Sequence, residues 1–343
     1  MLESCRMRFR LNPIAALSLS ATVLLGGCLS QTETGPNHGL WQLQKQRSEQ
    51  FLSATTDLAK TTQSVCTQGT PIDDARQAWK TVMANWMPLQ GVEKGSEDAL
   101  AQSWRIQFYP DKKNTTGRKI NALLASETQW TAEVLAEQSV AVQGVGAMEW
   151  LLYDQQADLS QPKHCEVAIA VSARLQQTAS ALNAAWQQNP WHGMPPSMAV
   201  SEKLGALTHQ LDYVLKKLSG PLGKPGFPNP YQGEAWRSRH SLTLLRQSIK
   251  AMQTQYHAEG GIEQSLRERG YDEVADRVSE HWQLAYNSMP QDGEPLFDRL
   301  NSVAGYRDML TVYNNLEYLK LVLGGQVAQD LGIIVGFNAS DGD

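Results

Sequence analysis

The chain of 343 residues has only four cysteines, hardly any strand-like sequence and none of the common catalytic motifs. No C-x-x-C-H is present, which excludes covalent haem attachment. A Walker A loop, a G-x-G-x-x-G turn, a G-x-S-x-G motif and an H-E-x-x-H pair are all missing. Period-2 alternation of apolar and polar residues never lasts more than a few residues. The sequence therefore points away from β and α/β folds and from the familiar hydrolase and nucleotide-binding templates.

Positive charge is also in short supply. The chain has 30 Lys and Arg against 35 Asp and Glu, a net charge of −5. Residues 1–27 carry three of the arginines and one glutamate, so the remainder has 27 basic and 34 acidic residues. Without a basic stripe, a nucleic-acid partner is not expected.

The first residues resemble the leader of a bacterial lipoprotein. Three arginines precede an apolar run that is too short to span a bilayer comfortably, and the run ends in the lipobox Leu25-Gly26-Gly27-Cys28. We expect residues 1–27 to be a signal peptide and Cys28 to carry the lipid, with several acyl chains for firm anchoring. Leu29, rather than aspartate, follows the cysteine, which predicts an outer-membrane lipoprotein facing the periplasm. An ordinary secretory signal with a chance cysteine is the alternative.

Two cysteines remain once Cys5 leaves with the leader and Cys28 takes the lipid. They are Cys66 and Cys165, and the expected compartment is one in which disulfides persist. We predict a bridge between them, with two separate buried thiols as the alternative.

Helical periodicity dominates the rest of the chain. A polar tether at 28–38 is followed by a predicted N-terminal helical bundle at 39–190, and a Pro/Gly cluster separates that bundle from a C-terminal one at 196–343. The fold class is therefore all-α, two tandem helical bundles. Helices are expected over 40–65, 73–88, 118–153, 165–188, 197–219, 234–258, 262–289 and 295–323, with a long loop at 220–233.

Glu149 is the most unusual charge in the sequence. It is the only charged side chain between Glu137 and Asp154, within the apolar segment 146–152. A carboxylate on so apolar a helix must be paired, bound to a metal or protonated. Such groups gather at functional sites. A glutamate on the solvated face of the helix is the structural alternative.

The segment around Glu149 resembles a known signature. Gly144-Val145-Gly146-Ala147-Met148-Glu149 is similar to the G-x-H-x-x-E motif of the imelysin family, with Gly146 where the family has histidine. Four further stretches resemble the same family, so the similarity covers nearly the whole chain after the leader. They are residues 75–79, 105–111, 234–238 and 335–343.

The resemblance implies a pair of helical bundles in a bacterial envelope protein linked to iron acquisition, with the signature facing a groove between the halves. Metallopeptidase activity is also associated with the family. Trp104-Arg105 and Trp236-Arg237 could shape the groove, or could serve as core and surface residues. The binding residues expected at the groove are Gly144, Gly146, Glu149, Arg105, Asp111, Glu234, Arg237 and Asn338.

The departure at Gly146 bears on function, because glycine offers no metal ligand and catalytic zinc needs about three protein ligands. We therefore expect no catalytic residue and no resident cofactor, with iron or another divalent metal at Glu149 left open. The leading hypothesis is a non-enzymatic binding component of iron acquisition whose partners are the outer membrane and iron-uptake envelope proteins. The alternatives are an imelysin-type metallopeptidase and a periplasmic metal carrier that uses Asp341 and Asp343.

Overall fold

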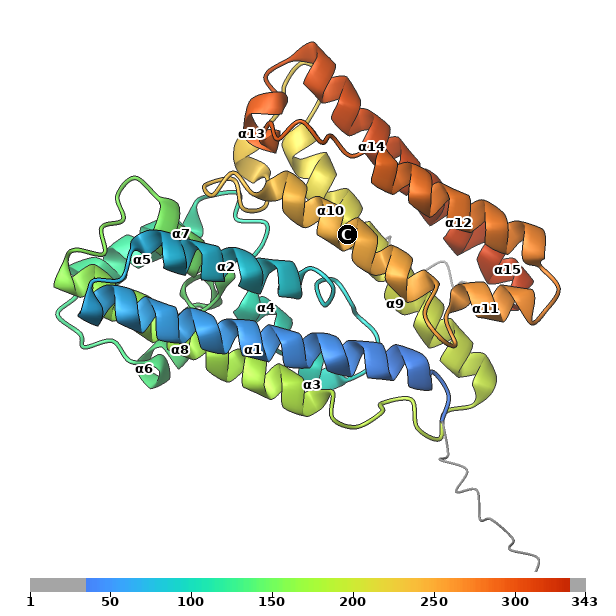
Figure 1. The fold of residues 1–343 in the computed structure, drawn as a ribbon, viewed down its shortest axis with the longest axis horizontal. Helices are drawn as coiled ribbons and strands as arrows, with labels where there is room; N and C mark the ends of the chain where they lie inside the picture. The colour runs from blue at the N-terminus through green and yellow to red at the C-terminus, as the bar shows by residue number, and fades with distance from the viewer. Residues whose placement is uncertain (1–34, 334–343) are drawn as a thin grey trace, which may run out of the picture. The chain divides into compact units, whose positions relative to one another are not determined.

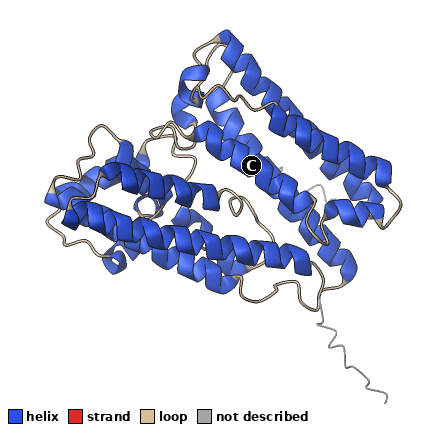
Figure 2. Ribbon diagram, in the orientation of Figure 1, coloured by secondary structure: helices blue, strands red, loops and turns tan. Residues whose placement is uncertain are grey.

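The computed structural model describes residues 35–333, and these are helical with no strand (Figures 1 and 2). Within these residues, strand-like pairing is limited to one isolated β-bridge between Lys224 and Phe227. The expected all-α fold is confirmed. Within the same residues, no helix is long and apolar enough to cross a membrane. Cys28, Asn338 and the acidic residues 341 and 343 lie outside the described range.

The N-terminal bundle is built on one long helix. Helix α1 packs along both α2 and α8, and α7 packs against α2 and α8 (Figure 1). Tryptophans fill its core, with Trp79 and Trp150 each 1% exposed. The bounds are α1 His38–Gln68, α2 Ile72–Trp86, α3 Glu97–Leu100, α4 Ser103–Ile106, α5 Thr115–Ala125, α6 Ala132–Ala136, η1 Val140–Val142, α7 Val145–Tyr153 and α8 Pro162–Ala185.

The C-terminal bundle has four main helices. Helix α9 packs against α10 and α14, and α12 packs against α10 and α14 (Figure 1). Trp282 and Leu316 are fully buried in its core. The bounds are α9 Pro196–Leu222, η2 Pro230–Gln232, α10 Ser241–Tyr256, α11 Ile262–Arg267, α12 Asp272–Asn287, α13 Leu296–Arg299, α14 Val303–Val322, the π-helical η3 Leu323–Val327 and α15 Ala328–Asp330.

Local sequence signals explain where the long helices begin and end. Pro162 and Pro196 each stand at the start of a helix, where the missing N–H is not needed. Gly69 ends α1 with a φ of 72°, a left-handed conformation that glycine adopts without steric cost. Ser302 caps α14 by accepting a hydrogen bond from the N–H of Gly305 at 2.9 Å.

Several predicted helices are shorter than expected. The helix predicted over 234–258 begins only at Ser241, because residues 233–240 form a loop. The segment 118–153 is broken into α5, α6, η1 and α7 rather than forming a continuous helix. The predicted helix 262–289 is divided by Gly270, whose φ is 82°, and the one over 295–323 is divided into α13 and α14.

Buried apolar residues form two clusters, one mostly from residues 40–191 and one from 204–331. Polar contacts join them. The amide of Gln210 on α9 donates to the carbonyl oxygens of Met87, Pro88 and Gln90, at 3.2 to 3.3 Å. Residues 35–333 belong to one compact unit, in which these contacts join the two bundles.

Cys66 and Cys165 are joined by a disulfide, with their Cα atoms 5.5 Å apart. Cys66 lies in the last turn of α1 and Cys165 in the first turn of α8. The bridge therefore closes one end of the N-terminal bundle.

Candidate functional site

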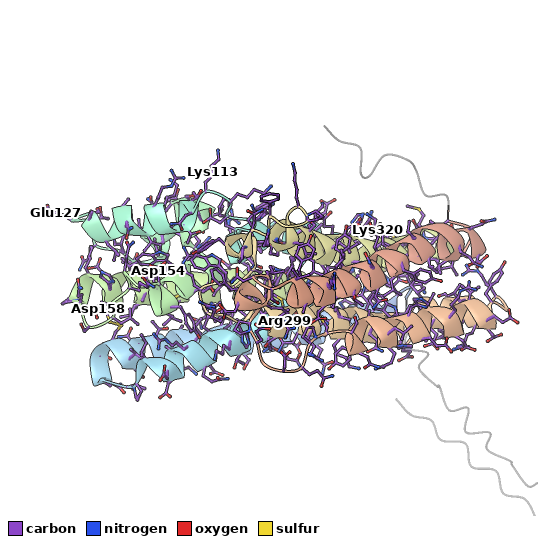
Figure 3. All side chains as sticks on the ribbon, turned by 90° about the horizontal axis from the view of Figure 1, so that it is seen from above. Lys113, Glu127, Asp154, Asp158, Arg299 and Lys320 are labelled. Atoms are coloured by element: carbon purple, nitrogen blue, oxygen red, sulfur yellow. A yellow bond between two sulfur atoms is a disulfide. The ribbon has the colours of Figure 1, made fainter. Side chains whose placement is uncertain are left out.

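A pocket of about 620 Å³ lies where the two bundles meet at the glutamate of the signature. Three parts of the chain line it: the loop 107–114 with Thr116 in α5, helix α7 with Asp154 directly after it, and residues 229–237 around η2. Phe108, Tyr109, Tyr231 and Trp236 give it aromatic walls. Lys113 is exposed and projects at the upper edge of the view in Figure 3, while Asp154 is half-buried.

Glu149 is 5% exposed and lines this pocket from α7. Its Oε1 accepts a hydrogen bond from the backbone N–H of Ser238 at 2.8 Å, which ties α7 to the loop before α10. Burial raises the pKa of the Glu149 carboxyl, and the hydrogen bond from Ser238 and the charge of Arg237 oppose that rise. The carboxylate is thus buried without a bonded cation among residues 35–333.

The two glycines of the signature have different structural roles. A side chain at Gly144 would place its Cβ 2.0 Å from the carbonyl oxygen of Ile106, so only glycine fits where α7 meets α4. At Gly146, which lines the pocket, a Cβ would meet nothing within 4 Å. Gly146 therefore leaves a hollow on the helix face that carries Glu149.

Arg237 reaches the pocket from the other bundle. Its Nε donates to Asp154 Oδ2 at 2.8 Å, and its Nη2 donates to Asn114 Oδ1 at 2.7 Å. The guanidinium lies over the ring of Trp236 at 4.3 Å from the centroid. These contacts hold the guanidinium in a fixed orientation, and its charge acts on the Glu149 carboxyl.

The backbone around Arg237 is held in an uncommon conformation. Ala235 and Arg239, on either side of it, have φ values of 53° and 59°, and Asn114 opposite has a φ of 49°. Non-glycine residues rarely adopt this left-handed region, and such residues cluster at functional sites. Asp111 supports the opposite wall, because its carboxylate accepts hydrogen bonds from the N–H groups of Thr115 and Thr116 at 2.6 and 2.8 Å.

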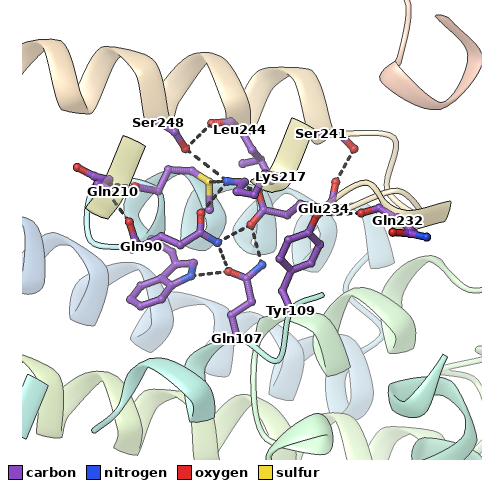
Figure 4. A network of polar contacts seen from close by, with 12 residues as sticks. Gln90, Gln107, Tyr109, Gln210, Lys217, Gln232, Glu234, Ser241, Leu244 and Ser248 are labelled. Atoms are coloured by element: carbon purple, nitrogen blue, oxygen red, sulfur yellow. Dashed lines mark hydrogen bonds and ion pairs between the residues drawn. The ribbon is translucent and has the colours of Figure 1, made fainter. Parts of the chain in front are cut away.

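Behind the pocket, Glu234 is buried in a polar network between the bundles (Figure 4). Its Oε2 lies 2.5 Å from Nζ of Lys217, and its Oε1 accepts from Gln107 at 2.7 Å and from Gln90 at 2.6 Å. Nε1 of Trp86 also donates to Gln107 Oε1 at 2.6 Å. Burial lowers the pKa of Lys217, while the partner carboxylate opposes that shift. The network leaves Glu234 fully partnered and closed to the pocket.

Tyr109 stands between the network and the pocket. Its hydroxyl donates to the carbonyl oxygen of Gln232 at 2.8 Å. Burial, together with the negative charge of Glu234, raises the pKa of Tyr109, so its hydroxyl stays protonated over the physiological range. It is therefore a hydrogen-bonding group of the pocket wall and not a base.

The structure brings four of the predicted site residues into one pocket: Asp111, Gly146, Glu149 and Arg237. Gly144 packs beside them and Glu234 lies behind. Arg105 is exposed, and its nearest polar partner is Gln102 at 3.4 Å, so it does not line this pocket. Sequence reasoning did not single out Asn114 and Tyr109 at the pocket, Ser238 beside Glu149, or Lys217, Gln90 and Gln107 in the network. The family-like stretches 105–111 and 234–238 contain Gln107, Tyr109 and Ser238, whereas no single-sequence signal marks Asn114, Gln90 and Lys217.

The polar groups at the pocket do not fit a metal ion. Asp154 is paired with Arg237, Asp111 is used by two backbone N–H groups, and Gly146 has no donor. In the part of the chain that the structure describes, no three His, Cys, Asp or Glu side chains are grouped as metal ligands. Glu149 alone falls short of the ligand sets that hold zinc or iron.

Known proteins similar to this chain share its fold. The sequence model of the imelysin family matches residues 45–323. An imelysin-like protein from Psychrobacter arcticum 273-4 has a TM-score of 0.70 at 19% identity, covering 88% of this chain and 95% of that one. A protein from Parabacteroides distasonis, assigned as an iron-regulated protein A precursor, has a TM-score of 0.63 at 14% identity, covering 88% and 97%.

Among curated proteins, no sequence matches the chain. At 19% and 14% identity, the two solved structures show that the fold is shared. The family model matches more than half of the sequence. The residues that match include the whole signature helix and both walls of the pocket. The chain belongs to the imelysin family.

Proposed function

We propose that this protein is a lipid-anchored envelope protein that serves iron acquisition by binding a ligand or partner at the Glu149 pocket, without catalysing a reaction. The observation that carries the proposal is the composition of the pocket. It joins a buried carboxylate from one bundle to an oriented arginine from the other, between aromatic walls. Clefts with a few convergent polar groups and aromatic walls are typical of small-molecule sites.

The pocket favours binding over peptide cleavage for a chemical reason. No histidine or cysteine of residues 35–333 lines it, and Gly146 has no side chain to complete a ligand set with Glu149. Zinc-dependent hydrolysis requires about three protein ligands and an open position. Catalysis at this pocket would therefore lack both a held metal and a nucleophile with its base.

The envelope and iron components of the proposal rest on other observations. Leu25-Gly26-Gly27-Cys28 follows an apolar run, which supports lipidation at Cys28. A structural relative is assigned as an iron-regulated protein A precursor. Together they support an outer-membrane lipoprotein that faces the periplasm and works with iron-uptake proteins.

Growth under iron limitation tests the proposal in cells. A strain without this protein should grow more slowly than its parent when iron is scarce and normally when iron is plentiful. The wild-type chain should restore growth, and the Cys28→Ala variant should not, because it loses the lipid. Labelled palmitate should appear on the wild-type chain only. Equal growth of the strain with and without the protein would contradict the iron role, and palmitate on the Cys28→Ala variant would contradict the anchor.

Two measurements on the purified protein distinguish the alternatives. We expect neither stoichiometric metal in elemental analysis nor chelator-sensitive cleavage of peptides. Bound metal without cleavage would favour the metal carrier. Bound metal with cleavage that a chelator abolishes would favour the metallopeptidase.

A further inference from the structure

One carboxylate that lines the pocket has few partners among residues 35–333. Of the three carboxylates that line the pocket, Asp154 is paired with Arg237 and Asp111 accepts two backbone N–H groups. Glu149 forms no salt bridge with any residue of 35–333, and its hydrogen-bond donors all belong to Ser238, whose backbone N–H bonds Oε1. No other residue of 35–333 donates to Oε2, and the glutamate lines the pocket. A buried carboxylate with an empty hydrogen-bonding position is costly unless something else fills that position.

Space for such a partner lies beside that oxygen. Gly146 precedes Glu149 by three residues in α7, so the two residues share one face of the helix. A Cβ built on Gly146 would touch nothing within 4 Å, and both residues line the same pocket. The hollow is therefore open to the pocket and adjacent to the carboxylate.

We propose that the hollow at Gly146 is a binding subsite for a nitrogen donor group, an imidazole or a primary amine, which donates a hydrogen bond to the free oxygen of Glu149. This inference rests on the proposed binding function and names the chemical class of its ligand. A group of this class would occupy the position that the missing side chain leaves open.

Charge selects a nitrogen donor over other small groups. An apolar group in the hollow would leave the carboxylate unpaired. A group that only accepts hydrogen bonds would place its own partial negative charge against the negative carboxylate oxygen. A protonated nitrogen instead forms a charge-assisted hydrogen bond with the carboxylate, which is shorter and about twice as strong as a neutral one. A bound cation would in turn favour the ionised form of Glu149 and so oppose the rise in its pKa that burial causes.

Aromatic side chains give the rest of the ligand a surface to contact. Tyr231 is 64% exposed and meets Trp236 edge to face, with ring centroids 4.9 Å apart. Both residues line the pocket together with Glu149. A planar or aliphatic ligand body could pack on these rings while its nitrogen reaches Glu149.

Imidazole itself is the probe that tests the subsite. Titration of the purified protein should shift the backbone amide NMR signals of Gly146 and Ser238 in a saturable way, with a dissociation constant in the millimolar range that is usual for so small a ligand. Oxazole has a ring of the same size with no N–H group, and we expect it to bind at least tenfold more weakly. Equal affinity for imidazole and oxazole would overturn the requirement for a donor.

Two variants locate the binding. Gly146→Met fills the hollow and Glu149→Gln removes the charge, and each should weaken imidazole binding at least tenfold. The matched control is Gly324→Met, because Gly324 is also a helical glycine with nothing within 4 Å of a would-be Cβ and lies far from the pocket residues in sequence. Gly324→Met should bind imidazole as the wild type does.

Gly146→Ala covers the case in which Gly146→Met fails to fold, because it adds one methyl group to the hollow and should weaken binding in the same direction. Unchanged imidazole affinity in either folded Gly146 variant would overturn the subsite.

If imidazole fails to bind while growth under iron limitation still depends on the protein, the subsite is wrong and the proposed function stands. If imidazole binds as described and growth does not depend on the protein, the iron role is wrong instead.

Discussion

Two buried glutamates lie between the bundles, and they have almost the same burial with different surroundings. Glu149 is 5% exposed and Glu234 is 4% exposed. Glu234 contacts the ammonium group of Lys217 and two glutamine amides, so both of its oxygens are occupied. Glu149 receives hydrogen bonds from Ser238 alone and opens onto a pocket. Burial alone therefore does not distinguish a structural carboxylate from one that binds a ligand. The two differ in the hydrogen bonds and ion pairs that their oxygens form.

The difference gives each glutamate a distinct role. A closed network with a buried ion pair holds the two bundles in one arrangement, and removing one partner would leave the other charge unpaired. An incompletely partnered carboxylate instead reduces stability unless a ligand completes it, and such exceptions in a folded protein call for an explanation. We interpret Glu234 as the group that joins the bundles and Glu149 as the group that binds.

The largest effect should come from breaking the closed network. Lys217→Met removes the ammonium group and leaves Glu234 charged and buried, which should lower the free energy of unfolding by about 3–5 kcal/mol. Urea unfolding followed by circular dichroism measures this loss. The control is Lys216→Met, because Lys216 is the exposed neighbour on the same helix and should change stability by less than about 0.5 kcal/mol. Similar losses in both variants would show that the network does not stabilise the fold.

Removing the disulfide breaks a link within the N-terminal bundle, whereas Lys217→Met breaks one between the two bundles. The double variant Cys66→Ser and Cys165→Ser opens a loop closed across 99 positions of sequence. We expect a loss of about 2–4 kcal/mol, since the bridge restricts the unfolded chain. Mass spectrometry of the non-reduced wild type should first show the two cysteines linked. Reduced wild type and double variant should then unfold at the same urea concentration, and an unchanged midpoint in both would contradict the account.

The sequence predicts the main helices well because their signals are local. The apolar spacing in α1, α8 and α9, and the Pro/Gly cluster before α9, place these helices within a few residues of where they lie. Glu149 is detectable because it is the only charged residue in an apolar segment. The network around Glu234 is not, because Gln90, Lys217 and Glu234 are distant in sequence and no periodicity links them.

The loop 233–240 shows where local signals mislead. Glu234, Ala235 and Arg237 all favour helices, so the sequence predicts a helix from 234. In the structure, Ala235 adopts a left-handed conformation while the Glu234 side chain reaches Lys217. Tertiary contacts override helix propensity here, and the loop they create carries Arg237 and Ser238 to the pocket.

Measuring the free energy of unfolding against pH should reveal the state of Glu149 while Glu234 stays in place. Because burial raises the folded-state pKa of Glu149 above its ordinary value of 4.5, protonation of Glu149 favours the folded state. Its contribution to stability is present below pH 4.5 and is lost as pH rises through the raised pKa. Glu149→Gln has no such proton, so the variant should gain stability relative to the wild type as pH rises from 4.5 towards neutrality. A constant difference over that range would contradict the raised pKa.

The smallest effect concerns the missing metal ligand. Gly146→His places an imidazole on the same helix face as Glu149, which makes two protein ligands where zinc sites use at least three. Added zinc should leave the unfolding midpoint of the wild type unchanged and stabilise the variant by less than about 1 kcal/mol, as expected when the dissociation constant is close to the zinc concentration. Strong stabilisation of the wild type by zinc would favour the metalloprotein alternatives.

The central claim is that Glu149 serves binding while Glu234 holds the bundles together, and growth of cells that carry Glu149→Gln tests it most directly. The variant should accumulate in the envelope at the wild-type level and unfold within about 1 kcal/mol of the wild type near neutral pH, since its shape is conserved and the removed charge was not paired with a bonded cation. It should nevertheless fail to restore growth under iron limitation in a strain without the protein. Full restoration of growth by Glu149→Gln at wild-type abundance would contradict the claim.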